Sequence, residues 1–224
     1  MAVLIQNELE RLKKRLLALS AEVEGRVQQA VQALLTADVE LANQVKKGDA
    51  QIDNLEIALE EECLKTLALH QPVANDLRFI ISVLKINNDL ERVADFAVNI
   101  AERAVDLSGS IRVECPYDIA MMAELVKNML RVSLDALMGQ DAELARKAIM
   151  MDDDIDQMHR ENFTKVKDAI RTDPTLMDAT IIYLSISRYL ERMGDLATNI
   201  AEDVVYQTEG EIIRHGGVQS IPET

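Results

Sequence analysis

The side chains best suited to chemistry in this sequence are carboxylates spaced four residues apart. Four such pairs recur at corresponding positions, two in each half of the chain: Asp49 and Asp53, Glu91 and Asp95, Asp152 and Asp156, Glu191 and Asp195. On a helix, residues four apart lie 40° apart and share a face. Carboxylates so placed repel each other by roughly 0.2–0.5 kcal/mol unless a cation compensates. Because oxygen-rich sites suit hard cations and iron, we predict that these acids bind metal ions.

A duplication accounts for the recurrence of the acids. Between residues 84–102 and 184–202, an offset of 100, 11 of 19 positions carry the same residue. The motif LERxxDxxxNIAE begins at Leu90 and again at Leu190, and the asparagines Asn99 and Asn199 recur with the acids. Such self-similarity indicates two related structural units.

Two other interpretations of the acids stay open. A charged stripe is commonly a solvated helix face, and aspartates such as Asp49 and Asp152 also suit helix N-termini as caps or as charges on the macrodipole. Arg92 and Arg192 follow Glu91 and Glu191 and are possible ion-pair partners, although they lie beside the stripe on a helical wheel.

The elements that must position these acids are helices. Aromatic residues make up 3% of the chain and apolar residues 48%, so the core is built from aliphatic side chains, which suits packed helices. Periodicity and breakers predict an all-α protein of two similar bundles, residues 1–107 and 116–210, followed by a C-terminal tail at 211–224. The expected helices cover about 9–35, 38–46, 49–70, 73–105, 118–138, 141–150 and 152–170, with a last helix opened by Asp173 as N-cap and Pro174.

The charge balance limits the possible partners. With 24 basic and 39 acidic residues the formal net charge is −15, which disfavours nucleic acid and anionic lipid and favours cations and basic protein surfaces. No apolar run reaches the roughly 20 residues of a membrane span, and charges interrupt the N-terminal segment, so no signal peptide is expected. Two cysteines make no disulfide framework. We expect a soluble, cytoplasmic protein without direct membrane insertion.

Catalytic motifs are not evident. The sequence has no P-loop, no CxxC and no nucleophile motif. His159, three residues after Asp156, resembles half of a ferritin-like ligand pair, but no second such motif occurs. The leading hypothesis is a non-enzymatic, metal-binding regulator. A metal-independent acidic adaptor and a carboxylate-bridged metal enzyme are the alternatives.

Several segments together resemble the PhoU family of phosphate-transport accessory proteins. They are PVANDLR at 72–78, LERVAD at 90–95, LERMGDLATNI at 190–200 and the stretch at 205–215. The resemblance implies two pseudo-symmetric three-helix bundles, a homodimer, and in some members multinuclear iron or zinc clusters at the eight acids named above.

The same resemblance implies a regulatory role. Family members repress the phosphate-starvation response and restrain phosphate uptake by linking the phosphate ABC transporter, through its ATPase, to a sensor histidine kinase. One difference separates the halves: TDPTLM at 172–177 does not reproduce PVANDLR, and Arg78 has no counterpart. We therefore expect the two halves to contact different partners.

Overall fold

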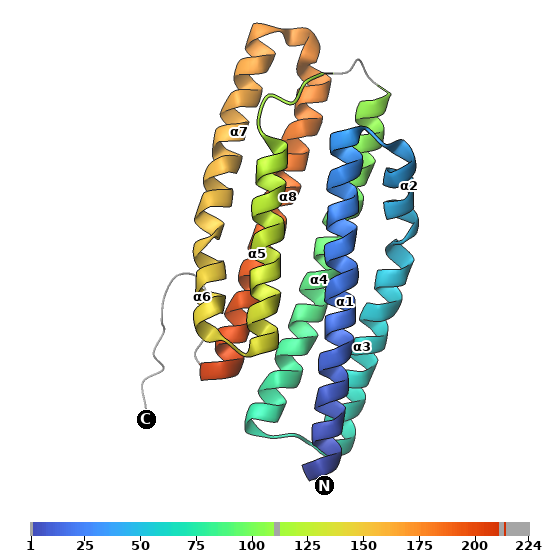
Figure 1. The fold of residues 1–224 in the computed structure, drawn as a ribbon, viewed down its shortest axis with the longest axis vertical. Helices are drawn as coiled ribbons and strands as arrows, with labels where there is room; N and C mark the ends of the chain where they lie inside the picture. Colours follow the sequence, from blue (N-terminus) through green and yellow to red (C-terminus); the bar gives the residue numbers. More distant parts are fainter. Residues whose placement is uncertain (1, 110–112, 211–212, 214–224) are drawn as a thin grey trace.

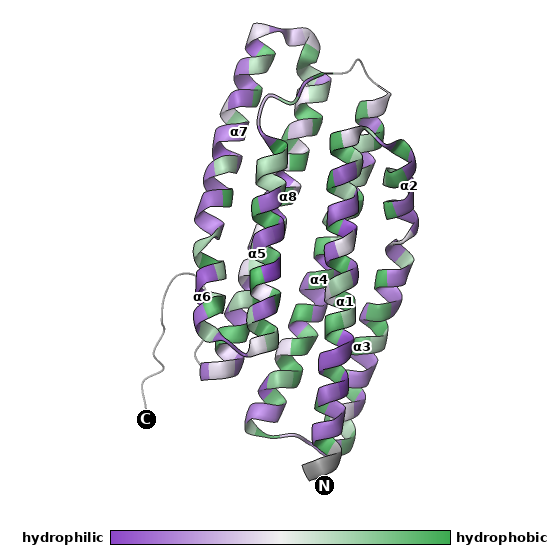
Figure 2. Cartoon of the chain, in the orientation of Figure 1, coloured by the Kyte–Doolittle hydropathy of each residue, from purple (hydrophilic) through white to green (hydrophobic). Residues whose placement is uncertain are grey.

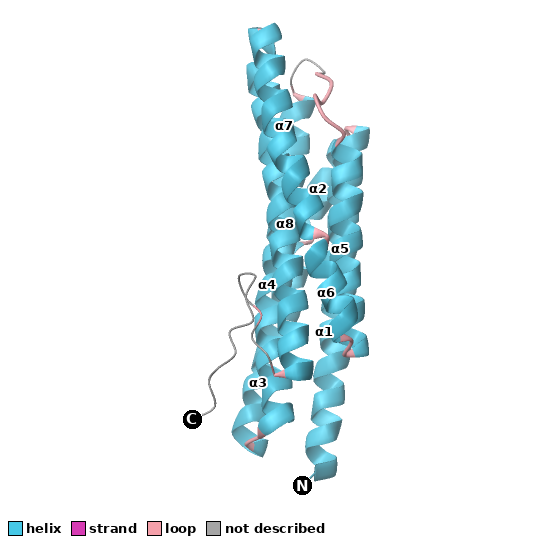
Figure 3. Ribbon diagram, turned by 90° about the vertical axis from the view of Figure 1, so that its left-hand side faces the viewer, coloured by secondary structure: helices cyan, strands magenta, loops and turns pink. Residues whose placement is uncertain are grey.

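The computed structural model describes residues 2–109, 113–210 and 213. Helices run along the long axis of the molecule, and the described residues contain no strand (Figures 1 and 3). The elements are α1 (Ala2–Thr36), α2 (Val39–Lys47), α3 (Asp49–His70), α4 (Ala74–Ser108), α5 (Ile119–Gly139), α6 (Ala142–Met150), α7 (Asp152–Thr172), the 3₁₀ turn η1 (Pro174–Leu176) and α8 (Met177–Glu209). The predicted all-α class is confirmed. The predicted helix boundaries agree to within about three residues, except that α1 begins at Ala2 and not at about residue 9.

The aspartates that cap helix N-termini are different residues from the predicted metal ligands. Asp38, Asp118 and Asp141 cap α2, α5 and α6 by accepting a backbone N–H three residues ahead. Asp49 and Asp152 are instead the first residues of α3 and α7, and neither helix has a side-chain capping bond. The capping interpretation of Asp49 and Asp152 is therefore wrong, and their carboxylates are free to face the neighbouring helix.

The start of the last helix also differs from the prediction. Asp173 accepts hydrogen bonds from the backbone N–H and the hydroxyl of Thr175, so it caps η1, and α8 begins only at Met177. This connection replaces the direct turn from Gln71 to Ala74 that joins α3 and α4 in the first half. The local difference in sequence between the halves thus becomes a difference in helix connection.

The chain forms two three-helix bundles in which a short and a long helix together make the middle member. The first consists of α1, α2 with α3, and α4; the second consists of α5, α6 with α7, and α8. Aliphatic side chains such as Leu12, Leu59 and Leu90 are fully buried in the first bundle, as are Met129 and Ile200 in the second. Figure 2 shows apolar and polar residues alternating around each helix, as an amphipathic bundle requires. The expected duplicated bundle architecture is confirmed.

The bundles join through α4 and α8, which run antiparallel. Lys85 Nζ lies 2.8 Å from Asp203 Oδ1, and farther along α4 the ring of Phe96 stacks on Tyr189 at 5.9 Å. Residues nearer the start of α4 therefore contact residues nearer the end of α8, as expected for antiparallel helices. The two LERxxD motifs, in the middle of α4 and α8, therefore lie at the centre of the molecule.

Other predictions from the sequence stand as follows. No helix among the described residues is long and apolar enough to cross a bilayer. The division into units at 1–107 and 116–210 stays a prediction. The expected tail at 211–224 lies outside the described residues except for Ile213, and residues 110–112 of the expected linker lie outside them as well.

Candidate metal centres

The second half brings three of its four predicted ligands together. One carboxylate oxygen from each of Asp156, Glu191 and Asp195 lies within 4.8 Å of the others. Asp156 comes from α7, and the other two come from successive turns of α8. A single ion between these helices would be within reach of all three oxygens, which is the donor set expected for a divalent cation.

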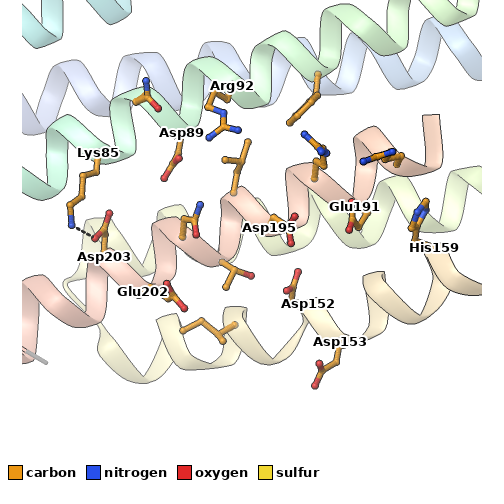
Figure 4. A pocket seen from close by; sticks show the side chains of 18 of the residues that line it. Lys85, Asp89, Arg92, Asp152, Asp153, His159, Glu191, Asp195, Glu202 and Asp203 are labelled. Carbon is orange, nitrogen blue, oxygen red and sulfur yellow. Dashed lines mark hydrogen bonds and ion pairs between the residues drawn. The ribbon is translucent and has the colours of Figure 1, made fainter. Parts of the chain in front are cut away.

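Asp152 completes this cluster from the first turn of α7. Its Oδ1 is buried and has no hydrogen-bond partner among the described residues, and Figure 4 shows it facing Asp195. Burial, followed by the charges of Asp195 and Asp156, raises the pKa of Asp152 to about 6. The Thr198 hydroxyl acts to lower this pKa but makes no hydrogen bond of ordinary geometry to Oδ1 among the described residues. The buried oxygen is therefore still costly, and a bound cation would remove that cost. The residues present therefore fit a metal ion.

Gly194 makes the close approach of Asp152 possible. A Cβ built on Gly194 would lie 3.3 Å from Asp152 Oδ1 and 3.3 Å from Ile155 Cδ1. The equivalent position in the first half, offset by 100, is Ala94. The helices α7 and α8 thus approach closely at the cluster because Gly194 has no side chain.

The pKa values of Glu191 and Asp195 are raised as well. Burial raises the pKa of Glu191, and the nearby charges of Asp195 and Asp156 raise it further. Burial and Asp156 likewise raise the pKa of Asp195, while Arg192 acts in the opposite direction. No ion pair of Arg192 is recorded within the described part of the chain, so its charge compensates the cluster only from a distance.

Asp156 has one nearby cation. Arg160 Nη1 lies 3.4 Å from Asp156 Oδ2, one turn along the same helix, and both side chains are substantially exposed. An exposed ion pair of this kind contributes little to stability, so a bound cation can replace Arg160 as the partner of Asp156. Arg192 and Arg188 also oppose the rise in the pKa of Glu191, but burial and the neighbouring acids outweigh them and the pKa stays raised.

The first half gathers its acids more loosely. Burial raises the pKa of Glu91, and the charges of Asp95, Glu56, Asp53 and Asp49 raise it further. For Asp95 and Asp49 too, burial is the largest cause of a raised pKa and Asp53 the next. All four predicted first-half ligands therefore share one electrostatic environment. Among the described residues, however, they do not form a three-oxygen set as close as that in the second half.

An arginine that sequence reasoning missed approaches the first cluster. Arg26 is 9% exposed and donates to the carbonyls of Gln44, Val45 and Gly48 at 3.4–3.5 Å. Its charge opposes the rise in the pKa of Asp49. The only sequence signal was a cation on the inner face of α1 near a glycine, which does not reveal a contact across helices.

A groove of about 1280 Å³ lies beside the second cluster. It is lined by residues of α4, α6, α7 and α8, among them Asp152, Glu191, Asp195 and His159 (Figure 4). Burial and the charge of Arg188 lower the pKa of His159, which keeps the imidazole neutral near pH 7. The groove gives ions in solution access to the carboxylates.

Comparison with known proteins agrees with this duplicated architecture. The PhoU domain profile matches residues 16–104 and 119–204, one match per bundle. The chain belongs to the PhoU family. The phosphate-specific transport system accessory protein PhoU homolog of Pseudomonas putida is 38% identical over 213 residues, covering 95% of this chain and 83% of its own. The corresponding homolog of Aquifex aeolicus is 38% identical over 209 residues, covering 93% and 95%.

Solved PhoU structures have the same fold. The crystal structure of PhoU from Pseudomonas aeruginosa matches with a TM-score of 0.88 at 37% identity, over 92% of this chain and 99% of that one. The phosphate transport system regulatory protein PhoU from Streptococcus pneumoniae matches with a TM-score of 0.82 at 30% identity, over 93% of this chain and 98% of that one. The family resemblance drawn from the motifs is confirmed. PhoU is a family of accessory and regulatory proteins, not of enzymes, which also confirms the expected class.

Proposed function

We propose that this PhoU protein represses the phosphate-starvation response and restrains phosphate uptake. The supporting observation is the match of both bundles to the PhoU domain, together with 38% identity to a phosphate-specific transport system accessory protein over 95% of the chain. In this role the protein links the phosphate ABC transporter, through its ATPase, to a sensor histidine kinase at the cytoplasmic side of the membrane.

The surface charge supports binding to proteins. A formal net charge of −15 favours association with basic surfaces and disfavours nucleic acid. The different connections between α3 and α4 and between α7 and α8 give the two ends of the molecule different surfaces. We infer that the two ends serve different partners, and that the protein acts as a homodimer.

Gene deletion and complementation in the host test this role. Deletion is expected to raise phosphate-starvation gene expression in phosphate-replete medium, and the intact gene is expected to restore repression. Capture from the host membrane fraction should recover the transporter ATPase and the kinase. Unchanged expression after deletion would refute the regulatory role. Light scattering of the purified protein tests the dimer separately.

The carboxylate clusters form the second part of the proposal. Asp49, Asp53, Glu91 and Asp95 would hold metal ions in the first half, and Asp152, Asp156, Glu191 and Asp195 in the second. Iron and zinc are the candidate ions. The buried, partnerless Oδ1 of Asp152 and the close set of Asp156, Glu191 and Asp195 support this assignment. When bound, the ions would neutralise the acids and join neighbouring helices within each bundle.

Metal analysis separates this proposal from a metal-independent adaptor whose acidic stripes bind basic partners. Protein purified without chelator is compared with a variant carrying Glu91→Ala, Asp95→Ala, Glu191→Ala and Asp195→Ala. The wild type is expected to retain metal and the variant to lose it, while circular dichroism shows equal helix content. A wild type without bound metal that gains no stability from added ions would favour the adaptor.

A further inference from the structure

Two pairs of equivalent positions beside the clusters carry different residues in the two halves. Glu56 of α3 corresponds to His159 of α7 at an offset of 103, and Asn87 of α4 corresponds to Ser187 of α8 at an offset of 100. Each pair forms a hydrogen bond between its two helices, next to the clustered acids. The donor chemistry at this position is therefore carboxylate in the first half and imidazole in the second.

In the first half, the asparagine holds the carboxylate. Asn87 is 1% exposed, and its Nδ2 donates to the backbone oxygen of Glu56 at 3.0 Å and to Glu56 Oε1 at 3.2 Å. Because Asn87 fixes one carboxylate oxygen, the other is available to a ligand. The donors offered by the first cluster are then all oxygen.

In the second half, a buried hydroxyl holds the imidazole. His159 Nδ1 lies 2.9 Å from Ser187 Oγ, and Ser187 is fully buried. Asn162 Nδ2 donates to the same hydroxyl oxygen at 3.1 Å, and Ser187 Oγ donates to Met122 Sδ at 3.4 Å. Asn162 Nδ2 also donates to Met122 Sδ at 3.4 Å, so Ser187 Oγ can either accept from His159 Nδ1 or donate to it. Metal binding through Nε2 requires the first arrangement, in which His159 carries its proton on Nδ1 and Ser187 accepts it. The Nε2 lone pair is then free to bind a metal ion, as in metal sites where a second partner fixes the tautomer.

His159 lies on the groove that borders the cluster, next to one of its acids. His159 lies one helical turn beyond Asp156, and Figure 4 shows its ring beside Glu191. The side chain lines the same groove as Asp152, Glu191 and Asp195. It lies at the edge of the three-carboxylate set rather than within it, so it would ligate an ion at the Glu191 end.

We propose that His159 is a metal ligand through Nε2, and that the second cluster is a mixed nitrogen–oxygen site while the first is an oxygen site. This inference rests on the proposed metal binding. Imidazole favours ions such as Zn²⁺, whereas carboxylate sites suit ions such as Mn²⁺. The two bundles therefore select different ions, with the zinc preference in the second.

NMR of the histidine side chains tests the ligand directly in the full chain. The protein has three histidines, so the imidazole ¹⁵N resonances are assigned with His159→Gln and His70→Gln. Adding Zn²⁺ is expected to shift the Nε2 resonance of His159 toward that of a metal-bound nitrogen and to leave His70 unchanged. A wild-type His159 resonance that does not move with saturating Zn²⁺ overturns the inference.

Calorimetry tests the ion preference. The background variant Asp53→Asn with Asp95→Asn disables the first cluster and isolates the second. In this background His159→Gln is expected to weaken Zn²⁺ binding by at least about 10-fold and to change Mn²⁺ binding by less than about threefold. His159→Glu, which restores the first-half donor, should lower the ratio of zinc to manganese affinity in the same direction. His70→Gln is the matched control.

The outcomes distinguish the two proposals. Zinc binding by the background protein that His159→Gln leaves unchanged refutes the role of His159 and keeps the metal proposal. Failure of both the wild type and the background protein to bind any metal refutes both. Loss of manganese and zinc affinity by equal factors assigns His159 a structural role and also overturns the inference.

Discussion

Replacement of Asp152 by asparagine is expected to stabilise the metal-free protein at pH 7. The amide would keep the shape of the side chain and remove a carboxylate whose Oδ1 is buried without a partner among the described residues. Folding raises the pKa of Asp152 from 3.8 to about 6, so the folded state binds more protons than the unfolded state between these values. Ionised Asp152 therefore costs stability fully above about pH 6, and this cost disappears as the pH falls below about 4.

The structure sets the size of the effect. A rise in the pKa of about two units corresponds to roughly 3 kcal/mol, and solvent screening of this half-exposed group reduces it to roughly half. Asparagine also loses the favourable interaction of a charge with the N-terminus of α7, worth roughly 0.5 kcal/mol. A net gain of about 1 kcal/mol remains, or about 2–4 °C in Tm for a chain of this length.

Urea unfolding in the presence of a chelator, at pH 7 and near pH 4, measures this gain. The difference between variant and wild type should be present at pH 7 and fade near pH 4. Asp154→Asn is the matched control, because Asp154 is exposed in the same first turn of α7 and is not among the charges that raise the pKa of Asp152. With saturating Zn²⁺ the sign should reverse, because the variant lacks a ligand. Destabilisation of the chelated protein by Asp152→Asn at pH 7 would refute the reasoning.

Other substitutions and conditions test the same structure. In chelator the wild type should be more stable near pH 5.5 than near pH 7.5, because the clustered carboxylates have raised pKa values; monotonic loss of Tm on acidification would contradict this. Gly48→Ala should cost about 1 kcal/mol in urea unfolding, because its Cβ would displace the guanidinium of Arg26 from its hydrogen bonds to the carbonyls of α2 and Gly48. Gly25→Ala, with open space around it, should gain up to about 1 kcal/mol. Gly194→Ala should displace the Asp152 carboxylate and lower its pKa in a carboxyl ¹³C titration, whereas Ala94→Gly should leave that pKa unchanged.

The sequence alone was sufficient to predict the helices and the internal duplication. Periodic apolar residues, scarce glycine and proline, and the repeated LERxxD motif depend on local spacing, which is set by the 3.6-residue turn of the helix. The acids of each pair share a helix face for the same reason, so Glu191 and Asp195 were predicted as one site. The capping assignment of Asp49 failed because Gly48 occupies the N-cap position and Asp49 is already the first residue of α3.

Only the tertiary structure decided how the two clusters differ. The spacing of the acids is the same in both halves, but Gly194 lets α7 approach α8 closely and buries an oxygen of Asp152. Arg26 gives the first cluster a nearby cation from a distant helix, and Ser187 fixes the imidazole of His159 in the second. These contacts join residues from 23 to 42 positions apart in the chain. Charge, burial and hydrogen-bond direction at each cluster therefore depend on how helices pack, which local sequence patterns do not specify.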